Sequence, residues 1–211
     1  MRANRNRWWK IYLSALLLIV AANNAIASDK TQNSRAVLKT ISEQVQVSDH
    51  AEGRFEQRKF LHILPQPLLS SGNFYLNQES GLVWQITEPL SSRIVFNHSG
   101  IHQSNNGQQP AWEVGNDQPV VSMIGQLMKA AISFDWELLE SYFFIEGRVD
   151  KSSDEQRWEL TLTPKEDYLL KTINRIELKG EQRLKELVLF EASNDRTEIT
   201  FNFVKTAPGS P

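Results

Sequence analysis

Short runs in which apolar and polar residues alternate recur along most of this chain, and no other feature constrains the fold more. In one run Leu82, Trp84 and Ile86 fall on one face, and in a later run Trp158 and Leu160 do the same. This period-two spacing is typical of strands that bury one face of a sheet. The pattern predicts roughly nine or ten antiparallel strands, in one block before the centre of the chain and one after it.

Three stretches have helical spacing instead. Residues 30–47 carry apolar side chains four apart, and a wide apolar face runs from Pro119 to Ile132. Proline suits the first turn of a helix, so the second helix is expected to begin there. A shorter helix is expected over Trp136–Phe144, and a loop over the polar stretch Asn105–Gly115.

This amount of helix can plug a curved sheet but cannot cover a flat one of that size. An antiparallel sheet with one apolar face must bury that face, and curling the sheet reduces the area left to cover. We therefore expect a mainly β fold with some α (α+β), namely a half-open antiparallel β-barrel covered by a few helices. The segment Ile63–Leu69 contains two prolines and should be a loop or a sheet edge, and Asn194-Asp195 should form a hairpin turn.

The first residues have the features of an export signal. Basic residues from Arg2 to Lys10 precede the apolar run Ile11–Ala22, and Ala25-Ile26-Ala27 provides a cleavage motif of small residues. The apolar run is 12 residues long, short of the roughly 20 that a membrane-spanning helix needs. We expect residues 1–27 to be a cleaved signal peptide and residues 28–211 to form one domain, with 206–211 disordered.

Charge and cysteine content exclude several classes of function. The expected signal takes four of the 23 basic residues, leaving 19 against 25 acidic ones and a net charge of −6 for the mature chain. Such a chain has no general attraction for nucleic acid or for an anionic membrane surface. The absence of cysteine removes disulfides, thiolate metal sites and a cysteine-linked lipid anchor.

No motif for catalysis or cofactor binding is present. The sequence contains no H-E-x-x-H, no G-x-S-x-G and no glycine-rich phosphate loop. His98 and His102 have a spacing seen in helical metal sites, but Ser99-Gly100 between them predicts a turn. We expect neither an enzyme nor a cofactor or metal.

An aromatic stripe follows the inward faces of the predicted strands and has two interpretations. It consists of Phe55, Phe74, Trp84, Phe96, Trp158 and Phe201. These rings could simply form a packed core, or they could line a ligand cavity. Met123 and Met128 in the covering helix favour a cavity, because methionine adapts its shape to different ligands.

The order of several short motifs resembles that of the bacterial outer-membrane lipoprotein carrier family, LolA. The N-terminal motifs are Gly53-x-Phe55-x-Gln57, Ser70-x-Gly72-x-Phe74, Leu82-x-Trp84 with Pro89, and Ile94 to Gly100. The C-terminal motifs are Trp158-x-Leu160-x-Leu162-x-Pro164 and Leu187 through Asp195, Thr197 and Phe201. The resemblance extends over about Ser34 to Phe203.

This resemblance implies a half-open barrel with a helical lid and a monomeric periplasmic carrier. Such a carrier shields lipoprotein acyl chains between an inner-membrane exporter and an outer-membrane acceptor. Two alternatives stay open: a periplasmic sensor or adaptor on the same scaffold, and an accessory protein for glycolipid or acyl-lipid export. Gln78 stands where the family has a lid-closing arginine and is the candidate lid contact.

The expected ligand-binding residues share one property, since all are apolar and face the concave side of the predicted sheet or belong to its lid. They are Phe55, Phe74, Leu76, Trp84, Ile86, Ile94, Phe96, Ile124, Leu127, Met128, Trp158, Leu160, Leu187 and Phe201.

Overall fold

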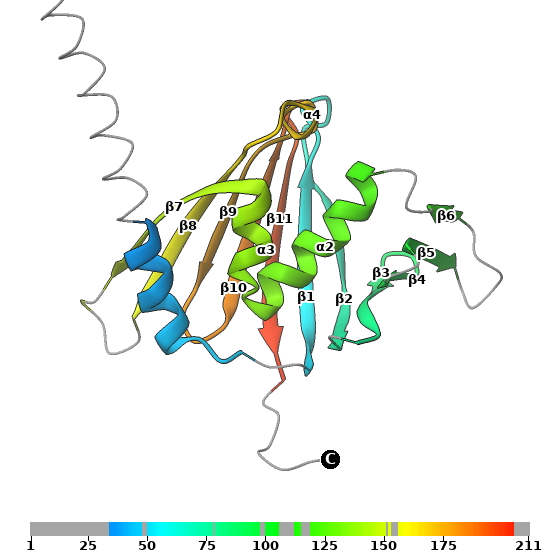
Figure 1. Cartoon of the computed structure of the whole chain (residues 1–211). Coiled ribbons are helices and arrows are strands. Elements are labelled where there is room, and N and C mark those ends of the chain that lie inside the picture. Colours follow the sequence, from blue (N-terminus) through cyan, green and yellow to red (C-terminus); the bar gives the residue numbers. More distant parts are fainter. Residues whose placement is uncertain are drawn as a thin grey trace, which may run out of the picture.

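The computed structural model describes residues 34–47, 50–77, 79–97, 100–105, 112–114, 119–150, 152 and 156–204. The expected signal peptide, the C-terminal tail from residue 206, Gln78 and His98 lie outside the described residues. Within the described residues, eleven strands form one sheet in the order β6-β5-β4-β3-β2-β1-β11-β10-β9-β8-β7 (Figure 1).

The first block of strands is a meander in which each strand pairs with the next. Its members are β1 (His50–Phe60), β2 (Leu68–Asn77), β3 (Gly81–Glu88), β4 (Ser92–Asn97), β5 (Gly100–Asn105) and β6 (Trp112–Val114). An N-terminal helix, helical over residues 34–44, precedes the block. The segment with two prolines is the loop between β1 and β2, because β2 begins at Leu68.

The second block follows two helices. The helices are α2 (Pro119–Ser133) and α3 (Trp136–Tyr142), and the short α4 (Asp167–Leu170) interrupts the strands that come after them. The strands are β7 (Phe143–Asp150), β8 (Arg157–Pro164), β9 (Ile173–Gly180), β10 (Leu184–Glu191) and β11 (Arg196–Phe203). The predicted hairpin turn between β10 and β11 is confirmed, with Asn194 at a φ of 67°.

The two blocks join through β1, which pairs antiparallel with both β2 and β11. Phe55 lies opposite Gly72 on one side and opposite Phe201 on the other. The ends of the strand order, β6 and β7, are not paired with each other, so the sheet is open. The predicted mainly β, half-open antiparallel architecture is confirmed.

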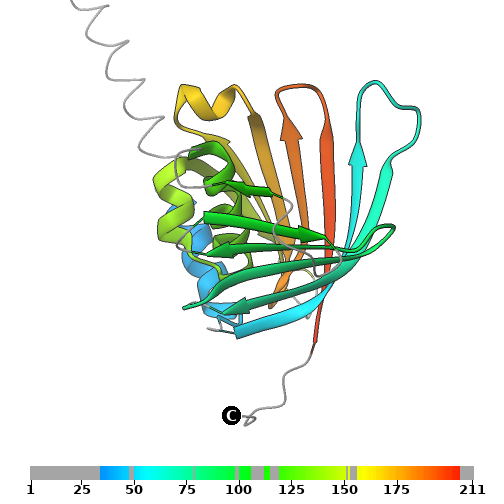
Figure 2. The same cartoon turned by 90° about the vertical axis from the view of Figure 1, so that its right-hand side faces the viewer.

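The curvature of the sheet places α2 and α3 on its concave side. Figure 1 shows both helices in front of the strands, and Figure 2 shows β3, β4 and β5 bending across toward them. The buried residues of the helices and of both strand blocks belong to one apolar core. None of the helices within the described residues is long and apolar enough to cross a membrane.

Three predictions about elements were wrong in detail. The sheet has one strand more than the upper expected number. The helix expected over Trp136–Phe144 ends at Tyr142, and Phe143 begins β7 with an extended backbone. Alternate burial of Phe143 and Ile145 around exposed Phe144 stabilises the strand, whereas the local sequence fits a helix equally well. Within the expected loop, Trp112–Val114 pairs with β5 as an edge strand.

Candidate functional site

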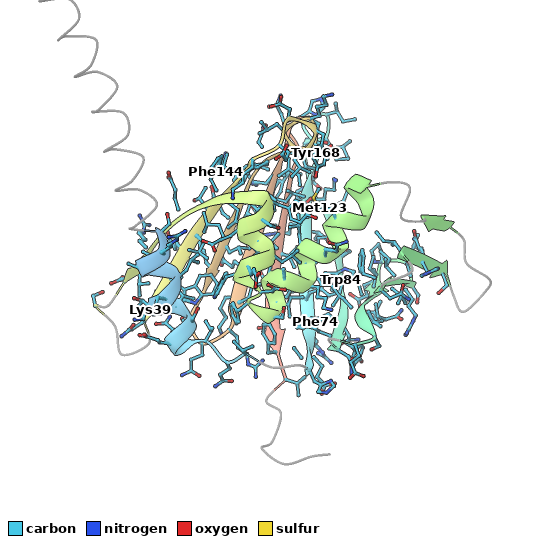
Figure 3. The ribbon with its side chains drawn as sticks, in the orientation of Figure 1. Lys39, Phe74, Trp84, Met123, Phe144 and Tyr168 are labelled. Carbon is cyan, nitrogen blue, oxygen red and sulfur yellow. The ribbon has the colours of Figure 1, made fainter. Side chains whose placement is uncertain are left out.

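Five aromatic side chains from four neighbouring strands meet on the concave face. The rings of this aromatic cluster belong to Phe55, Phe74, Trp84, Phe201 and Phe203. Phe55 stacks on Trp84 with ring centroids 3.7 Å apart, and Phe74 meets Phe201 edge to face at 5.7 Å. Figure 3 labels Phe74 and Trp84 of this cluster. The rings therefore fill much of the space below β1, β2, β3 and β11 with one another.

Several further predicted site residues occupy the same half of the molecule. Leu76 is buried in the core, while Ile86, Ile94 and Phe96 are half-buried and pack against it. The backbone of Ile124 lies in α2, but its side chain is not among those described. These positions place the residues on the concave side without showing that they contact a ligand.

A different lining appears under the second strand block. Ten aliphatic side chains surround a small cavity of about 40 Å³, which we call the aliphatic pocket. They come from α2, α3 and three adjacent strands, and are Leu127, Met128, Ala131, Leu139, Leu162, Ile173, Ile176, Leu178, Leu187 and Leu189. A cavity with such a lining does not hold water stably.

Three of the predicted site residues line this pocket. Leu127, Met128 and Leu187 were predicted site residues, and all three line it. Trp158 and Leu160 are buried in the same half but are not among its lining residues. The inward positions of β9, such as Ile176, could have been found from their alternation with polar residues. The aromatic stripe placed most of the predicted site under the first strand block instead.

Helix α2 rests directly on the first strand block. A Cβ atom added at Gly125 would overlap the ring of Phe96 in β4. Glycine at this position therefore lets the helix approach the strand at closer range than any other residue would. This contact holds α2 over the concave face.

The joint between α2 and α3 is fixed by a second group of rings. Phe134 has a φ of 58°, and the amide of Asp135 donates to the carbonyl oxygen of Ala130 at 2.9 Å, which ends α2 in a Schellman-type turn. The Phe134 ring lies 5.4 Å from that of Trp136 and 5.8 Å from that of Trp158. A phenylalanine in the left-handed region is strained, so packing against these two rings stabilises the joint.

A larger cleft of about 560 Å³ lies on the other side of α2 and has a mixed lining. It runs between α2, α3 and the ends of β3, β4 and β5, and it includes Gln126, Lys129, Asp135, Tyr142 and Tyr168. The Asp135 carboxylate accepts a hydrogen bond from the amide of Leu138 and caps α3. Amide, phenol and charged groups of this kind suit a polar ligand group.

The titratable groups with clearly shifted pKa values lie elsewhere. Hydrogen bonds from the amide and ring of His62 lower the pKa of Asp195 to about 2, and hydrogen bonds from Ser152 lower the pKa of Asp150. Neither residue lines the pocket or the cleft. Within the described ranges, no three acidic or histidine side chains gather as metal ligands.

Comparison with known proteins finds only distant likenesses to solved structures. No family model matches the chain, and no curated protein matches it. Similar solved structures include a LolA superfamily protein from Nitrosomonas europaea, at 12% identity and a TM-score of 0.42 over 83% of this chain and 95% of that one. An outer membrane lipoprotein-sorting protein domain from Vibrio parahaemolyticus has 8% identity and a TM-score of 0.43, with the same coverages.

A DUF1329 family protein from Desulfovibrio piger is also similar, at 11% identity and a TM-score of 0.44 over 84% of this chain and 95% of that one. One of these structures is described as a member of the superfamily that the sequence motifs resemble.

Proposed function

We propose that this protein is a periplasmic carrier that shields lipid acyl chains between α2 and the concave face of the sheet. The observation that carries the proposal is the aliphatic pocket, whose ten lining side chains present almost no polar atoms. An aliphatic lining gains free energy from burying a hydrocarbon chain and offers no polar group to an alternative ligand.

The pocket as it stands is too small for an acyl chain. Its volume of about 40 Å³ is close to the share of one water molecule in liquid, about 30 Å³. A chain can therefore enter only if α2 moves away from the strands. Met128 and the leucines around it can repack during such a movement, because their side chains are flexible.

The energetics allow both tight binding and release. Each buried CH₂ group contributes about 0.8 kcal/mol, so a chain of about twelve carbons would gain on the order of 10 kcal/mol. Separating α2 from Phe96 and from the pocket opposes this gain. A lid that closes on the empty pocket lowers the net affinity, which helps the carrier to release its cargo.

Both cavities support a cargo that has acyl chains and a polar group. Acyl chains would occupy the aliphatic pocket, and the polar part of a lipoprotein or related lipid would lie in the mixed cleft beside Gln126, Tyr142 and Tyr168. The export features of the first residues support a periplasmic location. An inner-membrane exporter and an outer-membrane acceptor are the partners that this role requires, and the protein would perform no chemistry on its cargo.

The test is a binding titration of the protein purified from the periplasmic fraction with a fluorescent fatty acid. We expect a saturable signal that an unlabelled fatty acid of the same length competes away. Ala131→Val should weaken this binding about tenfold by filling the pocket. A signal that neither saturates nor responds to competitor would overturn the proposal.

A further inference from the structure

Four large aliphatic side chains stand exposed on the loop between β1 and β2 and on the first residues of β2. Their exposed fractions are 74% for Ile63, 43% for Leu64, 53% for Leu68 and 63% for Leu69. We call these four residues the apolar tip. Scattered exposed leucines are ordinary, but a group of adjacent ones marks an interaction surface.

The loop is held in place rather than left free. The amide of Leu64 donates to the carbonyl oxygen of Leu61 at 2.9 Å, which closes a turn. The amide of His62 donates to the Asp195 carboxylate at 2.9 Å, and the ring Nδ1 of His62 lies 2.8 Å from the same oxygen. Pro65 limits the backbone further. The fold thus presents the apolar side chains in a fixed arrangement, which lowers the entropy cost of binding.

The apolar tip shares one rim of the sheet with other connections. Figure 2 shows the β1–β2 loop in cyan, the β10–β11 turn in orange-red and α4 in yellow-orange in a row at the top. Helix α4 adds Tyr168 and Leu170, each 41% exposed, between Lys165 and Lys171. Tyrosine and lysine are the residues that place a polar end at a membrane surface while their apolar parts are buried.

Charges next to the apolar tip neutralise one another. Lys59 forms an ion pair with Glu191 at 3.0 Å, and Arg58 and Arg196 each lie 2.8 Å from the Glu198 carboxylate. With Asp195 as the third carboxylate, three basic and three acidic side chains lie next to the tip. The surface around the tip therefore carries little net charge, which favours an uncharged apolar environment over a charged partner.

We propose that the apolar tip inserts into the surface of a lipid bilayer and brings the mouth of the mixed cleft to the membrane. Tyr168 connects the two, because it stands on the rim and also lines the cleft. Protein interfaces draw their binding energy mainly from Trp, Tyr and Arg and rarely from Leu, whereas the tip is aliphatic. A protruding loop enters a deformable bilayer without needing a complementary pocket. This inference goes beyond the binding of acyl chains and can be tested apart from it.

The lack of cysteine in the chain allows a direct test. Ile63→Cys carries the only thiol and can be labelled with an environment-sensitive dye. We expect the dye to shift to shorter wavelength and brighten when vesicles of phosphatidylcholine are added. The matched control is Val204→Cys, which is 49% exposed and follows the opposite end of β11; its dye should not change.

Vesicle flotation gives a second measurement. The double variant Ile63→Asp, Leu64→Asp should float at least about tenfold less than the unaltered protein, while Val204→Asp should float equally well. Both variants should keep their fatty-acid binding, so failure of the tip and failure of the proposed carrier function are distinguishable. The inference is overturned if the unaltered protein floats with neither phosphatidylcholine nor phosphatidylglycerol vesicles. It is also overturned if only the anionic vesicles bind, or if the aspartates change nothing because the tip serves a protein partner instead.

Discussion

The aromatic cluster and the aliphatic pocket line the same concave face and are built differently. Below β1, β2, β3 and β11, rings such as Phe55 and Trp84 lie in mutual contact, with centroids as close as 3.7 Å. Below β8, β9 and β10, aliphatic chains leave a small cavity of about 40 Å³. Rings are rigid and dock in few orientations, whereas leucine and methionine side chains can repack.

This difference suggests a division of roles along the sheet. The aromatic cluster joins the two strand blocks, because Phe74 of β2 and Trp84 of β3 both meet Phe201 of β11 edge to face. The aliphatic pocket lies where α2 and α3 cover the second block. We infer that the aromatic half stabilises the fold and that the side chains of the aliphatic half rearrange to admit a ligand.

The aromatic half should lose most stability when a ring is removed. Phe55→Ala deletes a fully buried ring that stacks on Trp84. Such truncations cost about 3–5 kcal/mol, and the free energy of unfolding from a urea titration measures the loss. Loss of less than about 1 kcal/mol would contradict the structural role of the cluster.

In the aliphatic half, two substitutions should have different effects on the unfolding free energy and on fatty-acid binding. Leu187→Ala enlarges the pocket and should cost about 2–3 kcal/mol of unfolding free energy, less than Phe55→Ala, while fatty-acid binding persists. Ala131→Val fills the pocket and should cost about 1–3 kcal/mol of unfolding free energy while weakening binding about tenfold. Urea titration and the fluorescent fatty acid measure the two quantities. Equal affinity in both variants would show that the ligand lies elsewhere.

The sequence predicted the sheet better than the site. Alternation at Leu82, Trp84 and Ile86 reflects burial of one face and is a local signal, so the architecture followed from it. Strand β6 could not be found, because pairing of Trp112 with β5 is a tertiary contact with no local pattern.

The sequence also does not show which of the inward-facing residues line a cavity. Phe74 and Ile176 both alternate with polar neighbours, yet one packs against rings and the other lines the pocket. Their neighbours come from distant segments of the chain, so no spacing in the sequence distinguishes them. The site prediction favoured large aromatic residues, and these lie in the half of the sheet that packs most tightly.

The contact between the lid and the first block should show a measurable coupling. In an exposed helix, alanine in place of glycine gains about 1 kcal/mol. Gly125→Ala should instead destabilise the protein by about 1 kcal/mol, because the added Cβ overlaps the Phe96 ring. In the Phe96→Ala background the same change should become stabilising. A double-mutant cycle by urea titration measures the coupling, and additive effects would mean that α2 does not rest on β4.

The smallest effect concerns the exposed contact that ties the two blocks together at the rim. Hydrogen bonds from His62, with that of its backbone amide the largest, lower the pKa of Asp195 from 3.8 to about 2. The folded state thus favours the carboxylate, so this contribution to stability is fully present above the unfolded pKa of 3.8 and is lost as the pH falls through about 2.

His62→Ala removes the ring but keeps the backbone amide, and should return the pKa of Asp195 only part of the way toward 3.8. An NMR titration of the Asp195 carboxyl group measures the shift, with Asp150 as an internal control whose own lowered pKa, caused by Ser152, should not move. A full return to the unfolded value in His62→Ala would show that the ring, and not the amide of the loop, holds the blocks together at this point.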